Sequence, residues 1–410
     1  MNTLTDYRTS IWKSSSFVIL FSSAFFVALG SKIYDLALPL LVYDLTQSSE
    51  MMGWMRAVEF LPNLLLALFI GVWVDRFDKK QWSQAMLLGQ IVTILISYSA
   101  VNWMTEPLYV LFPCAFLMMA FNYGYHNARM AMLKLALPQE QQNTATARMI
   151  SLYSLMETVG PVLSGALLLL SQLHQIFLGL ALLWLLAYWQ LNRLTLETPQ
   201  VSDHPPLWQA LREGWQVLYN EKNMWLITLA VMVINTTGSI FWIQSIYFAK
   251  AELSLSAIEV GYMVAASGIG GVLSAFVADK VRRQIGLGKL LILSIALESV
   301  GFVLPVLSPT PMMLIVAFFW VSAVGLFSNI CIWSYRQEAF SQQHLGRIAG
   351  LTGSLFKLLM PFGLAASGYL VTRYGSAELF SVCFAVQFVV AIFLLFSRVR
   401  AIPVTEYLTD

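Results

Sequence analysis

Charged residues are scarce in this chain of 410 residues, at 11% of the total, whereas soluble globular proteins carry about 25%. The shortage excludes a water-exposed surface for most of the chain. A formal net charge of only +2 gives no reason to expect a nucleic-acid partner. Cysteine is also rare, and Cys114, Cys331 and Cys383 lie far apart inside apolar runs. We therefore expect neither a disulfide framework nor a metal site.

Motifs for catalysis and nucleotide binding are missing as well. The nearest sequence to a phosphate loop, IGLGKL (285–290), lacks both the earlier glycine and the Ser or Thr after lysine. No HExxH, no GxSxG and no cluster of His or Asp suited to a metal occurs. These absences argue against an ATP-driven pump and against a membrane-embedded lipid enzyme. We expect no enzymatic activity and no cofactor, which leaves an ion gradient as the driving force for any transport.

Long apolar runs dominate what is present. Hydrophobic residues make up 58% of the chain and its mean hydropathy is +0.69, with runs of the roughly 20 residues that a bilayer-spanning helix needs. Segments such as NLLLALFIGVWV (63–74) do not alternate in polarity as barrel strands would. We predict an all-α integral membrane protein with twelve spans, near 16–44, 51–74, 82–101, 108–131, 147–170, 175–191, 224–248, 257–278, 289–306, 312–335, 347–371 and 378–397.

The long polar stretch at 192–222 divides the chain. It carries a Pro pair followed by an amphipathic pattern of Leu207, Leu211, Trp215 and Leu218, which indicates a short surface helix. We therefore predict a six-helix half at 1–191, a cytoplasmic linker at 192–222 and a second six-helix half at 223–410.

The distribution of basic residues predicts the orientation. If the N-terminus is cytoplasmic, all but five of the 24 Lys and Arg residues fall on the inner side. The exceptions are Lys250 and Arg373 outside, and Lys32, Arg56 and Lys357 within spans. Because positive residues accumulate in cytoplasmic loops, we expect both termini to be cytoplasmic. No cleavage site follows the polar N-terminus, so we expect the first span to be retained.

The two halves resemble each other in sequence. GVWVDRFDKK (71–80) after the second span matches AFVADKVRR (275–283) after the eighth, and METVGPVLSG (156–165) matches FKLLMPFGLAASG (356–368). Asp75 and Asp279 are 204 positions apart, and Pro161 and Pro361 are 200 apart. Duplicated halves related by a pseudo-twofold axis along the membrane normal are a transporter architecture.

At these residues the chain resembles the major facilitator superfamily. The loop signature of that family corresponds to Gly71, Asp75, Arg76, Lys79 and Lys80, with Asp78 in place of the second glycine. The GPVLSG segment, with Gly160, Pro161 and Gly165, is similar to the fifth-helix signature of proton-coupled exporters. Further segments, ALPLLVYDLTQSS (37–49), NARMAMLKLALP (127–138) and LGRIAGL (345–351), are similar to the branch with macrolide-efflux pumps and the enterobactin exporter. That branch implies a bacterial inner membrane.

The resemblance implies a cytoplasmic latch in the loop after the second span. Gly71 would allow close approach of helices, Asp75 and Arg76 would hold the halves together in the outward-facing state, and Asp279 would be the weaker counterpart in the second half. An acid beside a helix N-terminus and an Arg can form such a charge-assisted contact. Lys79 and Lys80 are explained equally well as topology anchors.

Ionisable residues inside spans are functional candidates, because a charge at mid-bilayer costs about 2.5–3.5 kcal/mol on insertion scales. Lys32 with Asp35, and Arg56 with Glu59, are spaced i, i+3 and so share a helix face. Both acids lie roughly 12 Å below the outer surface, at about 1.5 Å per residue. We predict one cluster, with Asp35 as first choice for the proton carrier and Glu59 as second, and Lys32 and Arg56 as the competing cations. The alternative is two neutral pairs that only join helices.

Three further charges lie within spans. Glu157 and Lys357 each precede a repeated proline, Pro161 and Pro361, by four residues. They could form latches, line the cavity, or pair with neighbours for neutrality alone. For Glu298, on a span that the family places at the periphery, we expect a structural pairing.

The resemblance also implies that spans one, four, seven and ten line the central cavity. Those spans are rich in aromatic residues, which suit a bulky amphipathic cargo better than a sugar, although some will be ordinary packing residues. His126 and Arg129 could meet an anionic substrate, or Arg129 could extend to the headgroups. The candidate cavity residues are Tyr34, Tyr123, His126, Arg129, Asn235, Trp242, Trp320 and Trp333.

These observations together predict a proton-coupled antiporter that exports amphipathic small molecules, such as macrolides or siderophores, by alternating access. Its expected partners are a small-molecule substrate, protons and the lipid bilayer, and we expect it to act as a monomer. An importer or a lipid flippase of the same fold are the alternatives. The fifth-helix signature favours export over import.

Overall fold

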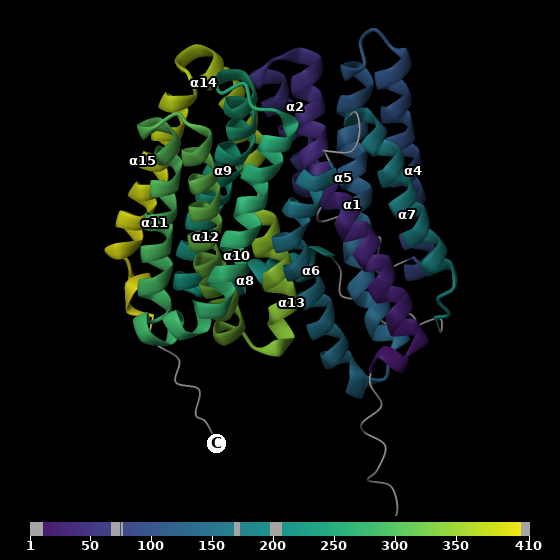
Figure 1. Cartoon of the computed structure of the whole chain (residues 1–410). Coiled ribbons are helices and arrows are strands. Elements are labelled where there is room, and N and C mark those ends of the chain that lie inside the picture. Colours follow the sequence, from purple (N-terminus) through teal and green to yellow (C-terminus); the bar gives the residue numbers. More distant parts are fainter. Residues whose placement is uncertain (1–10, 67–73, 75–76, 168–172, 197–206, 403–410) are drawn as a thin grey trace, which may run out of the picture.

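The computed structural model describes residues 11–66, 74, 77–167, 173–196 and 207–402, and its regular structure within these ranges is helical throughout (Figure 1). The first half contains η1 (Ile11–Lys13), α1 (Ser15–Thr46), α2 (Ser49–Leu65), α4 (Lys79–Trp103), α5 (Leu108–Ala136), α6 (Gln139–Leu167), η2 (Leu173–Gln175) and α7 (Ile176–Asn192). The rest of the chain contains α8 (Leu207–Asn220), α9 (Lys222–Tyr247), η3 (Phe248–Glu252), α10 (Ala257–Ile285), α11 (Leu287–Leu307), α12 (Pro311–Ala339), α13 (Gln342–Leu355), α14 (Met360–Tyr374), α15 (Ser376–Leu395) and η4 (Arg398–Ala401). The prediction of an all-helical chain is confirmed for the described residues.

Polar residues at the ends of the apolar runs start several of these helices. The side chain of Ser14 accepts a hydrogen bond from the backbone of Phe17 at 3.4 Å, and Ser48 caps α2 in the same way through Met51 at 3.3 Å. Ser256 and Glu259 form a reciprocal capping box at the start of α10. Such caps satisfy backbone N–H groups that lack partners within the helix. Inside a bilayer the remaining backbone groups must be bonded within the helices.

Nine helical segments of the described residues are long and apolar enough to cross a membrane. α7 is apolar but has only 17 residues, and α2 is described over only 17 residues. The α13 and α14 helices form one of the nine segments, Ile348–Tyr374. The chain is therefore a multi-pass helical protein, and the count of twelve spans stays a prediction.

Helix packing within the two halves follows the same pattern. In the first half α4 contacts α5 and α7, α1 contacts α6 and α7, and α2 contacts α5. In the second half α11 contacts α12 and α15, α9 contacts α14 and α15, and α10 contacts α12. Each of these five contacts in one half has its counterpart in the other at the matching place in the chain order. This correspondence agrees with the sequence repeat. The pseudo-twofold axis between the halves stays a prediction that it supports.

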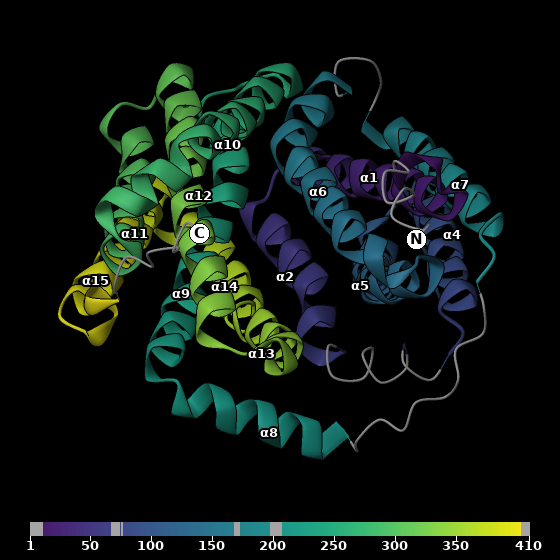
Figure 2. The same cartoon turned by 90° about the horizontal axis from the view of Figure 1, so that it is seen from below.

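The halves meet mainly along two helix pairs, α2 with α14 and α6 with α10, and α1 and α2 also contact α9. Figure 2 shows both pairs side by side. α1 begins and α15 ends at the lower end of the bundle in Figure 1, which we call the termini side. The opposite end, where α2 begins, we call the far side.

Glycines allow α2 and α14 to approach closely on the far side. A Cβ at Gly53 would lie 2.6 Å from the carbonyl oxygen of Leu364, and one at Gly368 would lie 2.5 Å from that of Ser49. The hydroxyl of Ser49 donates to the carbonyl of Gly368 at 3.0 Å. Backbone contact of this kind is typical of small residues at helix crossings in membranes.

The eleventh predicted span is interrupted between α13 and α14. At residues 356–359 the backbone bonds change to an i to i−3 pattern, including the bond from the Met360 N–H to the Lys357 carbonyl at 3.2 Å. Pro361 explains the change, because it has no N–H to donate to the Lys357 carbonyl and its ring crowds that carbonyl. Lys357 therefore lies at a break in the helix.

The helix α8 lies outside the two bundles in Figure 2 and packs against α9 and α13. The rings of Trp215 and Trp225 meet edge to face at 5.5 Å, which attaches α8 to the first turn of α9. The part of the linker at 197–206 lies outside the described residues.

Candidate functional site

A cavity of about 330 Å³ lies between the two halves. The first half contributes Lys32 and Asp35 from α1 and Arg56 from α2, and the second half contributes apolar and hydroxyl side chains of α9, α10 and α12. Phe241 and Trp242 provide aromatic surface on the α9 wall. The cavity is therefore charged on one side and lined by aromatic, aliphatic and hydroxyl side chains on the other.

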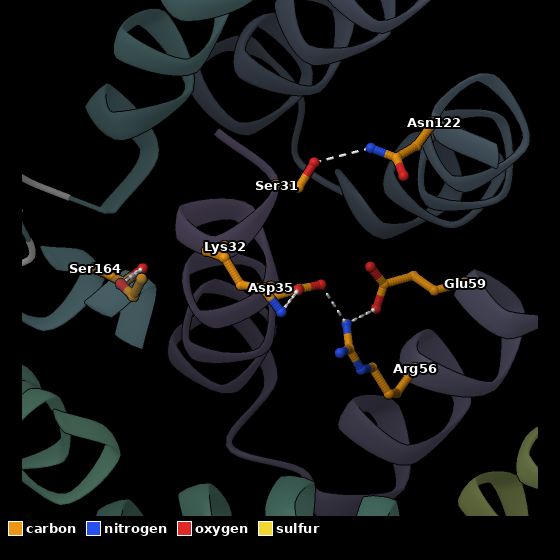
Figure 3. Close-up of polar contacts among 8 residues, drawn as sticks. Ser31, Lys32, Asp35, Arg56, Glu59, Asn122 and Ser164 are labelled. Carbon is orange, nitrogen blue, oxygen red and sulfur yellow. Dashed lines mark hydrogen bonds and ion pairs between the residues drawn. The ribbon is translucent and has the colours of Figure 1, made fainter. Parts of the chain in front are cut away.

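Four of the predicted membrane charges of the first half form one cluster, and three of them, Lys32, Asp35 and Arg56, line this cavity (Figure 3). The Arg56 guanidinium lies 2.9 Å from Glu59 Oε2 and 3.4 Å from Asp35 Oδ1, while Lys32 Nζ lies 4.0 Å from Asp35 Oδ2. Arg56 thus connects two carboxylates on different helices. Two acids and two bases give a cluster with no net charge, which lowers the cost of burying them.

The two carboxylates differ in their access to the cavity. The side chain of Asp35 is 30% exposed and lines the cavity, whereas that of Glu59 is 1% exposed. The second carboxylate oxygen of Glu59, Oε1, has no hydrogen-bond partner among the described residues. The Asp35 carboxylate is therefore open to the cavity, whereas the Glu59 carboxylate is enclosed by protein.

Aromatic rings hold the Arg56 side chain from two sides. Its guanidinium carbon lies 5.2 Å from the ring centre of Phe60 and 5.3 Å from that of Trp242. Cation–π contacts of this length are favourable, more so where water is excluded. Trp242 belongs to the second half, so Arg56 connects the charged cluster of the first half to the second half.

The Gly160 position supports Lys32. A Cβ at Gly160 would lie 2.8 Å from Lys32 Cγ, so the aliphatic stem of the lysine rests on the α6 backbone. Glu157, Pro161 and Gly165 also lie on α6, but their side chains are outside the part of the chain that is described.

Lys357 contacts the opposite half through α2. Its Nζ donates to Asn63 Oδ1 at 3.5 Å, and Asn235 of α9 donates to the carbonyl of Phe356 in the same break at 3.1 Å. Pro361 begins α14 directly after the break. The interrupted span is therefore joined to both α2 and α9 near the centre of the protein.

The Arg129 side chain is buried within the first half. Its guanidinium contacts His126 Nδ1 at 2.8 Å and lies over the ring of Tyr153 at 3.9 Å. Only 7% of the residue is exposed, so Arg129 does not extend to the headgroups. Neither Arg129 nor His126 lines the central cavity described above.

The other candidate aromatic residues occupy different surroundings. Trp242 lines the cavity, whereas Tyr34 is buried and faces Phe177 of α7 at 6.4 Å. The indole of Trp320 donates to the carbonyl of Leu297 on α11 at 2.6 Å. Trp333 is 54% exposed and stacks under Arg336 at 4.7 Å, and Tyr123 packs in a small cluster with Val74.

The latch predicted after the second span is described only in part, because Gly71, Asp75 and Arg76 lie outside the described residues. Asp78, which departs from the family signature, caps α4 by accepting the Gln81 N–H at 2.7 Å. Lys79 donates to the carbonyl oxygens of Val74 and Phe77, and Lys80 donates to that of Asn192 at 2.9 Å. These lysines tie the loop to the first half.

The counterpart in the second half is an ion-pair network. Asp279 lies 3.0 Å from Arg283 and 3.4 Å from Arg282, and Arg282 lies 3.3 Å from Glu338 at the end of α12. In the described residues these pairs connect α10 to α12 within one half. Asp279 forms no described ion pair with the first half.

Asn63 is a site residue that the sequence reasoning missed. It is 3% exposed, holds Lys357, and lies on the same helical face as Arg56 and Glu59, at i+7 and i+4. That spacing was available in the sequence. A neutral amide in an apolar helix attracts less attention than a charge, which explains the omission.

The fold and the charged cavity define a helical transporter, and comparison with known proteins identifies the family. Residues 20–363 match the model of the Major Facilitator Superfamily. The chain belongs to this superfamily.

Similar proteins include efflux pumps. Macrolide efflux protein A of Streptococcus pyogenes is 26% identical over 354 residues, covering 80% of this chain and 83% of that protein. The multidrug efflux pump Tap of Mycolicibacterium fortuitum is 29% identical over 195 residues, covering 44% of this chain and 45% of the pump. Among solved structures, the nucleoside transporter NupG (D323A mutant) is similar with a TM-score of 0.75 at 14% identity, covering 93% of this chain and 100% of that one. At that identity the structural likeness shows the fold alone.

Proposed function

We propose that the protein is a proton-coupled antiporter that exports amphipathic drugs of the macrolide kind from the bacterial cytoplasm across the inner membrane, with both of its termini cytoplasmic. The similarity to macrolide and multidrug efflux proteins supports the substrate class. The cavity wall of Phe241 and Trp242 suits such cargo, because aromatic surface binds bulky apolar groups.

The observation that carries the coupling proposal is the ion pair between Asp35 of α1 and Arg56 of α2 at the cavity wall. A proton that neutralises Asp35 removes its attraction for both Arg56 and Lys32. The two helices then lose a charge-assisted link, and Arg56 is left with Glu59 alone. Proton binding at Asp35 can in this way change how α1 and α2 pack.

Contacts on the far side support alternating access. Lys250 Nζ lies 3.9 Å from Asp44 Oδ1, and the rings of Tyr43 and Tyr247 meet at 5.9 Å, so α1 contacts the end of α9 and η3. Ser49 of α2 bonds to α14 at the same end. In the predicted orientation the far side faces outward, and we infer that this is a state closed to the outside. Export would require these contacts to open.

The export proposal is tested in bacterial cells that carry the gene on an inducible plasmid. Induction should lower the accumulation of radiolabelled erythromycin, and a protonophore should raise it again. Asp35→Asn should abolish this effect at unchanged protein level, whereas Glu106→Gln, an equal charge change at an exposed loop residue, should not. Higher accumulation on induction would indicate an importer, and full export by Asp35→Asn would overturn the coupling assignment.

A further inference from the structure

A second, smaller cavity lies inside the second half. Its volume is about 180 Å³, and it is lined from α9, α11 and α12. Gly238 and Ser239 of α9 line both this cavity and the central one. The small cavity is therefore a side branch that adjoins the central cavity on its second-half wall.

Glu298 of α11 is the charged residue of this side cavity. It is 8% exposed, and its Oε2 atom is buried without a hydrogen-bond partner among the described residues. Its carboxyl group contacts the amide of Gln387 on α15. This partner is a neutral amide, and no described ion pair involves Glu298. A buried carboxyl group without a cation is costly unless it holds a proton or binds a cation from outside the protein.

The rest of the lining is neutral and offers hydrogen-bond acceptors. Asn235 uses its amide N–H to bond the Phe356 carbonyl at 3.1 Å, which leaves its side-chain oxygen as an acceptor. Ser328, bonded to Ser294 at 2.9 Å, and Asn329 lie on the α12 wall. One negative charge among neutral acceptors suits a ligand with a single positive charge.

The other acids near the cavities are already occupied. Asp35 faces Arg56 and Lys32, and Glu59 faces Arg56. A cation entering the central cavity would be repelled by Lys32 and Arg56 and would find no free negative charge there. Glu298, in the adjoining side cavity, is the carboxylate that can receive it.

A divalent metal ion does not fit this site. Calcium needs six to eight oxygen ligands and magnesium prefers carboxylates with retained waters, whereas Glu298 is the one carboxylate in the lining of this cavity and the described residues contain no group of three or more His, Cys, Asp or Glu suited to a metal. An organic ammonium group is larger, carries one charge, and is compatible with a cavity of this size.

We propose that Glu298 binds the ammonium group of a cationic amphipathic substrate, with the head in the side cavity and the apolar body against Phe241 and Trp242 in the central cavity. This inference rests on the proposed function and narrows its substrate class to amphipathic molecules with one basic nitrogen. Gly238 and Ser239 are the residues past which such a molecule would extend from one cavity into the other.

The test uses three fluorescent probes that share a diphenylhexatriene body and carry a trimethylammonium head, no head, or a propionate head. Binding to the purified full-length protein in detergent is followed by energy transfer from tryptophan. The wild-type protein should bind the trimethylammonium probe most tightly. Glu298→Gln should weaken that binding about tenfold, because a charge-assisted contact is lost, and should leave the uncharged probe unaffected.

Two further variants separate binding from folding. Glu106→Gln makes the same charge change at an exposed loop residue and should alter no affinity. Gly325→Ala keeps the charge, but its Cβ would lie 2.9 Å from Glu298 Oε1 and displace the carboxyl group. It should weaken binding of the trimethylammonium probe alone, and so tests the site even if Glu298→Gln fails to fold.

Equal affinities for the three probes, or equal weakening of all three by Glu298→Gln, would overturn the inference and give Glu298 a packing role. The measurement needs no gradient and has no direction, so its outcome is independent of the erythromycin experiment. Export of erythromycin with no charge preference in binding would leave the proposed function standing without this site. If binding showed a charge preference that depends on Glu298 but the protein did not export erythromycin, the site would stand and the proposed function would fall.

Discussion

At the scale of single residues, Arg56 is central to the proposed coupling mechanism because it contacts both carboxylates of the cluster and two aromatic rings. It pairs with Glu59 and Asp35 and lies near the rings of Phe60 and Trp242. A lysine could not replace it fully, because the guanidinium is planar and can serve two carboxylates and two rings at once. In the proposed mechanism the same residue would stabilise the fold, line the cavity and take part in coupling.

The buried pair of Arg56 and Glu59 leads to a prediction on stability. Arg56→Met alone should lower the free energy of unfolding by about 3 kcal/mol, because Glu59 would be left buried without its cation. The double variant Arg56→Met with Glu59→Leu should regain most of that loss, since apolar replacement of a buried pair is often neutral. Thermal unfolding of the purified protein in detergent measures both.

Measuring transport by the same variants separates a role in stability from a role in coupling. The double variant should remain inactive despite its stability, since it lacks Arg56, the nearer of the two cations that compete with protons for Asp35. If it exported drug at the wild-type rate, the cluster would serve only to join helices.

Helical spacing was sufficient to predict which membrane charges share a face, because i, i+3 neighbours are fixed by local geometry. The contact between Arg56 and Asp35 depends on how α1 and α2 pack. It was predicted because Asp35 and Glu59 lie at a similar depth below the outer surface. Side-chain direction was harder. Tyr34 and Trp320 lie on cavity-lining spans of the family, yet Tyr34 faces α7 and Trp320 bonds to α11, because rotation of a helix about its axis is set by tertiary packing.

At the scale of elements, the close crossing of α2 and α14 depends on glycine. Gly53→Ala should weaken this crossing, because the new Cβ would lie 2.6 Å from the Leu364 carbonyl oxygen, which is backbone and cannot rotate away. We expect a lower melting temperature and greater labelling of a cysteine placed at Ser49 by a membrane-impermeant maleimide. Gly350→Ala is the matched control, since a Cβ there has nothing within 4 Å. Equal melting temperatures and labelling in the two variants would show that the crossing tolerates separation.

The break between α13 and α14 shows what an apolar pattern leaves out. Hydropathy predicts one uninterrupted span at 347–371, because apart from Arg347 and Lys357 its residues are apolar, small or weakly polar. The interruption follows from Pro361. Because proline has no N–H, the carbonyl of Lys357, four residues earlier, loses its usual helical hydrogen bond. The proline was evident in the sequence. Whether a proline breaks or merely bends a helix depends on neighbours that can bond the released carbonyls, here Asn235 at Phe356.

At the scale of the whole molecule, alternating access would require the two halves to move relative to each other. The halves meet mainly along α2 with α14 and α6 with α10. The far-side contacts include one ion pair at 3.9 Å, a ring contact and the hydroxyl bonds of Ser49. Isolated polar contacts of this kind contribute little each, about 0–1 kcal/mol for an exposed ion pair. A closed state held by such contacts can open at modest cost, which alternating access requires.

A disulfide across the far side should therefore stop transport. The Ser49 and Thr372 hydroxyl oxygens are 3.2 Å apart on α2 and α14, so the double variant Ser49→Cys with Thr372→Cys places two thiols within bonding reach. Cys114, Cys331 and Cys383 are buried and should not compete. Oxidation should abolish erythromycin export in inverted membrane vesicles, and a reductant should restore it, because the link would hold the halves together where they must part. Each single variant, treated with the same oxidant, controls for loss of the hydroxyl groups. Undiminished export by the oxidised double variant, with the cross-link verified by mass spectrometry, would mean that the far side need not open between α2 and α14 and that the route to the outside lies elsewhere in the bundle.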